Sequence, residues 1–189
     1  MSAALEVVRA SAHVAEVWLN RPDVRNAFDD GVVAELTHAF RALGADAALR
    51  CIVLGGRGRA FCAGADLAWM KSTAGYGWDD NHADAARLAD MLWTIWDCPL
   101  PVVGRIHGDC YAGGVGLAAV CDVLVAAEGV HFCLSEARLG LLPATIGPYV
   151  VRALGEARRS IHVQAYLLTS RAIARALQEA KARGVAVEL

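Results

Sequence analysis

Two short runs of small residues, each between an expected strand and an expected helix, constrain this chain more than any other part of its sequence. The first, AFCAGADL, covers residues 60–67, and the second, GDCYAGGVG, covers residues 108–116. Glycine and alanine leave the backbone bare, and the first N–H groups of a helix have no partners within the helix. A ligand can therefore meet peptide N–H groups at each turn. Together the two turns predict a pair of backbone donors aimed at one oxygen, as stabilisation of an enolate or a tetrahedral oxyanion requires.

The apolar pattern around these turns alternates between strand and helix spacing. Strands are expected at residues 5–10, 12–20, 51–54, 102–106, 122–126 and 130–134, the first two as a hairpin. Helices are expected at residues 30–43, 67–70, 84–96, 114–120 and 149–154, with residues 71–81 irregular. This alternation predicts an α/β layered domain over residues 1–155. Residues 156–189 have a helix-forming composition without a strand signal and predict a short helical segment.

Composition excludes several classes of partner. The chain has 18 basic and 20 acidic residues, whereas proteins that bind nucleic acid or an anionic membrane present a clustered basic face. Its apolar runs are too short to span a bilayer. The six cysteines lie far apart, and no secretory leader is evident, so we expect reduced thiols in a cytoplasmic protein. No metal site is expected, because the histidines and cysteines share no ligand spacing.

Four motifs resemble those of the crotonase (enoyl-CoA hydratase/isomerase) superfamily. Besides the two small-residue turns, they are NRP followed by RNA within residues 20–27, and FCLSE followed by LGLLP within residues 132–143. The resemblance covers residues 5–155. It implies an α/β fold, a spiral of ββα units that assembles as a homotrimer or hexamer. In this chain residues 156–189 leave only a short C-terminal helical segment after the spiral.

The resemblance also implies a set of site residues. The oxyanion-binding amides are those of Ala65 and Gly113, and the acid that moves the proton is Glu136. The remaining contacts with the acyl group and coenzyme A fall on Arg25, Ala27, Ala63, Asp66, Leu67, Tyr111, Gly114, Ser135 and Leu139. The implied partner is an acyl-CoA thioester, with coenzyme A as part of the substrate and no separate cofactor.

The implied reaction is addition of water to a 2-enoyl-CoA, with charge developing on the thioester oxygen. Residues around Trp69 and Ser135 look most like the branched-acid hydratases, such as methylglutaconyl-CoA hydratase. Many hydratases of the family carry a second glutamate at the position of Gly116, so an enoyl-CoA isomerase of the same family is an alternative. Members of the family also continue well past residue 189, which leaves a truncated, non-catalytic protein that binds CoA thioesters as a further alternative.

Two unrelated functions have weaker support. Residues 108–114 resemble the nucleophile elbow of an α/β-hydrolase with Cys110 as nucleophile, but neither His131 nor His162 has a suggestive acidic partner. Residues 114–119 match the dinucleotide-binding pattern GxGxxA. That fold expects an acid at the end of the next strand of a plain β-α-β unit, whereas the nearest acid here, Glu136, follows an extra strand.

Overall fold

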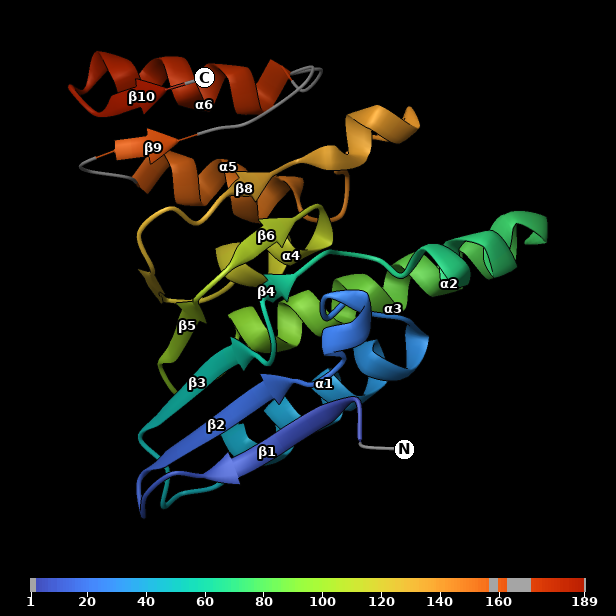
Figure 1. Ribbon diagram of the computed structural model, residues 1–189, viewed down its shortest axis with the longest axis vertical. Coiled ribbons are helices and arrows are strands. Elements are labelled where there is room, and N and C mark those ends of the chain that lie inside the picture. The colour runs from blue at the N-terminus through green and yellow to red at the C-terminus, as the bar shows by residue number, and fades with distance from the viewer. Residues whose placement is uncertain (1–2, 157–159, 163–170, 189) are drawn as a thin grey trace.

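The computed structural model describes residues 3–156, 160–162 and 171–188. Its larger sheet has five strands in the order β1 (Leu5–Arg9), β2 (Val14–Leu19), β3 (Cys51–Gly56), β5 (Val102–Ile106) and β7 (Val123–Ala126). β1 and β2 form the expected antiparallel hairpin, and all other neighbours in this sheet are parallel. The sheet lies at the N-terminal end of the molecule, and the chain rises from it toward the C-terminal helices (Figure 1).

A smaller sheet of three parallel strands continues from the larger one. Its strands are β4 (Ala60–Cys62), β6 (Asp109–Tyr111) and β8 (Phe132–Cys133), in that order. Each follows a strand of the larger sheet along the chain and leads into a helix. This confirms the expected spiral of ββα units. β4 and β6 were not expected as strands, because each has three residues and coincides with a small-residue turn.

Helices α1 (Asp30–Gly44) and α3 (Trp78–Trp96) pack against each other and against the larger sheet. Leu36 and Phe40 of α1 and Leu92 of α3 share one buried cluster with strand residues such as Ile52. α3 begins six residues before the expected helix, since its exposed first turns are polar and show no apolar periodicity. Its N-terminal part extends beyond the sheets together with α2 (Leu67–Ser72), as Figure 1 shows.

The C-terminal part combines helices and strands. α4 (Gly113–Ala119) and α5 (Gly147–Glu156) agree with the expected helices, and α6 (Arg171–Ala182) packs on α5. The segment expected to be purely helical also contains β9 (Ser160–His162) and β10 (Ala186–Glu188), which pair in parallel. Strands of three residues are too short to give a periodic signal. In the part of the chain that the structure describes, no helix is sufficiently long and apolar for a membrane span.

Candidate active site

The two small-residue turns lie directly against each other. Gly64 has a φ of +87°, and a methyl group there would lie 2.9 Å from the Gly113 nitrogen and 2.8 Å from the Ala112 Cβ. Real Cβ atoms do not approach other atoms so closely, so only glycine allows this contact. The turn at residues 63–65 therefore meets the start of α4 at the level of the backbone.

Both turns present a backbone donor that has no partner among the described residues. Within residues 3–156, neither the Ala65 N–H nor the Gly113 N–H donates a hydrogen bond. Gly113 is the first residue of α4, and the residue before it, Ala112, has a φ of 47° and a ψ of −123°. Non-glycine residues in such regions cost about 1–3 kcal/mol of strain and gather at functional sites. The Ala112 N–H donates to the Cys133 carbonyl (2.8 Å), which holds the strained residue in place.

A pocket of about 590 Å³ opens beneath the two turns. Eleven of the twelve residues assigned to the site by resemblance line it: Arg25, Ala27, Ala63, Ala65, Asp66, Leu67, Tyr111, Gly113, Ser135, Glu136 and Leu139. Gly114 does not, since it packs against β4, where a methyl group would lie 2.5 Å from the Cys62 carbonyl oxygen.

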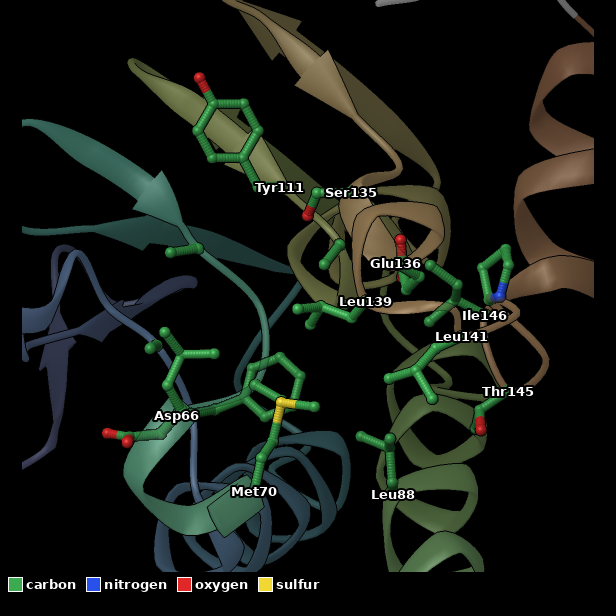
Figure 2. Close-up of a pocket in the computed structure, with 18 of the residues that line it drawn as sticks. Asp66, Met70, Leu88, Tyr111, Ser135, Glu136, Leu139, Leu141, Thr145 and Ile146 are labelled. Carbon is green, nitrogen blue, oxygen red and sulfur yellow. The ribbon is translucent and has the colours of Figure 1, made fainter. Parts of the chain in front are cut away.

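Several further residues line the pocket that were not assigned to the site from the sequence. They are mostly apolar and include Phe28. Figure 2 shows five others: Met70, Leu88, Leu141, Thr145 and Ile146. Met70 lies on α2 and Leu88 on α3. Helical spacing shows which residues share a face, but the packing of the helices decides which face reaches the pocket.

Glu136 lies on a 3₁₀ turn, η3 (Ser135–Leu139), on the same pocket wall as Leu139 and Ile146 (Figure 2). Its Oε2 atom is buried and has no hydrogen-bond partner among the described residues. Burial raises the pKa of the Glu136 carboxyl above its ordinary value. A half-buried acid with one unsatisfied oxygen, in a largely apolar wall, suits proton transfer.

The wall beside Glu136 has no room for a second acid at residue 116. A methyl group on Gly116 would lie only 2.2 Å from the Ile146 Cγ2 atom, and Ile146 is itself buried. Ile146 thus occupies the space into which a longer side chain from α4 would point.

Asp66 also lines the pocket, but both of its carboxylate oxygens are bound within the chain. One accepts from the Ala68 and Trp69 N–H groups (2.8 and 3.4 Å) and caps α2, while the other accepts from Arg21 Nη2 (3.0 Å). Burial opposes ionisation, yet these donors hold the pKa of Asp66 below its ordinary value. In the structure Asp66 therefore acts as a helix cap and as a partner of Arg21.

Arg21 belongs to the NRP motif, and in the structure it links several parts of the site. Its guanidinium binds Asp66, donates to the Ala27 carbonyl (2.6 Å) and pairs with Asp29 (3.0 Å). Asp29 caps α1 by accepting from the Val32 N–H. One cation thus ties together the caps of two helices that border the site.

Cys110 does not have the properties of a nucleophile. It is fully buried, and burial, together with the neighbouring thiols of Cys62 and Cys121 and the carboxylate of Asp109, raises the pKa of its thiol well above the ordinary value. A reactive cysteine needs an accessible thiolate. The structure therefore weakens the cysteine-hydrolase alternative.

A family model described as enoyl-CoA hydratase/isomerase matches residues 9–189. Enoyl-CoA hydratase AFT6-1 of Alternaria alternata is 36% identical over 166 residues, covering 84% of this chain and 54% of the relative. A mitochondrial Delta(3,5)-Delta(2,4)-dienoyl-CoA isomerase of Mus musculus is 34% identical over 148 residues, covering 72% of this chain and 44% of the relative. The crystal structure of an enoyl-CoA hydratase from Shewanella pealeana superposes with a TM-score of 0.77 at 35% identity, covering 80% of this chain and 57% of that one. This chain spans about half the length of these relatives.

Replacement of Glu136 by glutamine is expected to raise thermal stability at neutral pH and to have no effect in acid. Burial raises the folded-state pKa above the unfolded value of about 4.3, so the wild type loses stability as the pH rises through the folded-state pKa. Below the unfolded value the acid is protonated in both states, and the advantage of glutamine disappears. Melting temperatures of both proteins between about pH 4 and pH 8 test this. A difference that is constant with pH would contradict it.

Replacement of Asp66 by asparagine is expected to have the opposite pH signature. The folded-state pKa of Asp66 is depressed, so its carboxylate stabilises the folded protein at pH values above the unfolded pKa of about 3.9. This stabilisation is lost as the pH falls through the folded-state pKa. We expect a loss of about 1–3 kcal/mol in the free energy of unfolding near neutral pH. Urea titrations of both proteins at neutral and acidic pH measure this difference in the free energy of unfolding. The exposed Asp97, replaced in the same way, is the control and should change stability little at either pH.

Proposed function

Because this chain belongs to the enoyl-CoA hydratase/isomerase family and has its crotonase fold, we propose that the pocket binds an acyl-CoA thioester and adds water to a 2-enoyl-CoA. The amides of Ala65 and Gly113, which have no partner in the part of the chain that the structure describes, bind the thioester oxygen, and Glu136 moves the proton. Coenzyme A enters as part of the substrate.

The observation that carries this proposal is the placement, around the same pocket, of two backbone donors and one carboxylate oxygen that have no partner among the described residues. As water adds to the β carbon, the electrons of the double bond shift toward the thioester and negative charge grows on its oxygen. Two fixed N–H groups stabilise that charge without reorganising, and in other enzymes loss of one such donor lowers kcat by about 10²–10³-fold. The strain at Ala112 is consistent with a donor held in one orientation.

Glu136 supplies both halves of the proton transfer. As a carboxylate it removes a proton from the attacking water while the C–O bond forms at the β carbon. It then returns that proton to the α carbon as the enolate collapses, so the elements of water are added in full. A raised pKa suits a group that must act in turn as base and as acid near neutral pH.

Isomerisation of an enoyl-CoA is the second candidate, and the contact between Gly116 and Ile146 favours it. A hydratase has to orient a water molecule, whereas an isomerase needs one acid to carry a proton between the α and γ carbons. The apolar Ile146 beside Glu136 provides no second hydrogen-bonding group for water. A dienoyl-CoA isomerase is also among the similar proteins.

Incubation with straight-chain and branched 2-enoyl-CoA and 3-enoyl-CoA thioesters distinguishes the two reactions. Hydration removes the enoyl thioester absorbance and adds the mass of one water, whereas isomerisation moves the double bond without a change in mass. Glu136→Gln is expected to lower kcat by about 10²-fold or more with little change in KM. The exposed Glu128, replaced by glutamine, is the matched control. Failure of the wild type to convert any of these thioesters would refute the proposed function.

Assembly into a homotrimer or hexamer is part of the proposal. The edge strand β7 supports it, since Val123, Leu124 and Val125 are 52%, 43% and 58% exposed. An exposed apolar edge is usually covered by other protein.

Light scattering is expected to give a mass of three or six chains of 20.0 kDa. Val125→Lys, at this edge, is expected to reduce the assembly because it places a charge on the apolar strand. Val7→Lys, on strand β1 at the opposite edge, serves as the control. A monomer at all concentrations would contradict the assembly while leaving the chemistry of the pocket open to its own test.

A further inference from the structure

The backbone of Phe28 holds the Ala65 turn on both sides. The Phe28 N–H donates to the Gly64 carbonyl (2.9 Å), and the Phe28 carbonyl accepts from the Asp66 N–H (2.9 Å). These bonds form an isolated parallel bridge between Phe28 and Ala65. The peptide that carries the Ala65 N–H is therefore fixed relative to the Phe28 backbone.

The ring of Phe28 reaches the other turn. A methyl group on Gly113 would lie 2.5 Å from the Phe28 Cζ atom and 3.0 Å from Cε1. The end of the ring thus lies directly against the Gly113 backbone. Phe28 is 1% exposed and belongs to the main buried cluster, so the ring has little space in which to move.

The segment from which this ring projects is anchored independently. Arg21 binds the Ala27 carbonyl and the Asp29 carboxylate on either side of Phe28. The buried Asn26 donates to the carbonyls of Arg57 and Ala60 (2.8 and 2.9 Å). Because the backbone around Phe28 cannot easily shift, the length of its side chain determines how closely Gly113 approaches.

We propose that Phe28 is the spacer that sets the separation and relative orientation of the Ala65 and Gly113 amides. Its backbone positions one donor and its ring positions the other. Phe28 is therefore a positioning residue, and the inference rests on the proposed function of these two amides. Displacement of a catalytic group by about 1 Å can cost about 10²-fold in rate, so the effect of a shorter side chain should be measurable.

Phe28→Leu removes the ring atoms that touch Gly113 and leaves the backbone bridge intact. We expect kcat to fall by about 10²-fold while KM stays within about two-fold, the pattern of an interaction made in the transition state. Phe40→Leu is the matched control, since Phe40 is equally buried in the same cluster but lies on α1 away from the pocket lining. It should lower the melting temperature comparably and leave kcat within about two-fold. Equal effects of the two substitutions on kcat would overturn the inference.

A double substitution tests the spacer role through the geometry itself. Gly113→Ala alone places a methyl group against the Phe28 ring and should lower both the melting temperature and kcat. In the Phe28→Leu background the same methyl group has space. The double variant should therefore be at least as stable as Gly113→Ala alone, and it should recover part of the kcat that Gly113→Ala loses. The combination of Gly113→Ala with Phe40→Leu should show no such compensation.

The two proposals fail in different ways. If the wild type converts no enoyl-CoA, the proposed function falls, while the melting temperatures of the double variants still decide whether the ring and Gly113 are in contact. If turnover is present but the Phe28 and Gly113 substitutions do not compensate each other in stability or in kcat, the spacer inference falls and the proposed function stands.

Discussion

The contact between Gly64 and the start of α4 is the constraint on which the rest of the site depends. It brings together segments separated by about fifty residues of sequence at a distance that excludes any side chain between them. The three-stranded sheet makes this contact possible, since β4 and β6 are parallel neighbours and each lies in the first part of one of the two turns. The spiral therefore has a chemical consequence, because parallel strands deliver both turns to the same edge.

Two carboxylic acids in the same pocket have opposite electrostatic surroundings. Asp66 is surrounded by donors from α2 and Arg21, which favour the charged form. Glu136 has a buried oxygen without a donor, so burial favours the neutral form. The first acid is suited to holding structure and the second to exchanging a proton, although the residue types differ by only one methylene group. Burial raises the pKa of both acids, so the opposite directions of their pKa shifts come from the hydrogen bonds that each carboxylate accepts.

The sequence predicted the parts of the site that depend on backbone chemistry. The two glycine-containing turns, the capping role of Asp66 and the opening hairpin follow from local rules, and eleven of the twelve residues that the resemblance assigned, Glu136 among them, line the pocket. The very short strands and the polar first turns of α3 were missed, because they have too few apolar residues to form a period. Arg21, Phe28 and Ile146 were missed for a different reason. Their roles arise from contacts between segments distant in sequence, which no spacing rule describes.

The packing of Ile146 on Gly116 also restricts how this pocket can change during evolution. An acid introduced at residue 116 by a single mutation would collide with Ile146 before it could hold a water molecule. A lineage that gained such an acid would first need a smaller residue at position 146, and that intermediate would carry a void in its core. The two positions therefore form an epistatic pair, and the order in which they mutate determines whether a two-acid pocket is reachable from this sequence.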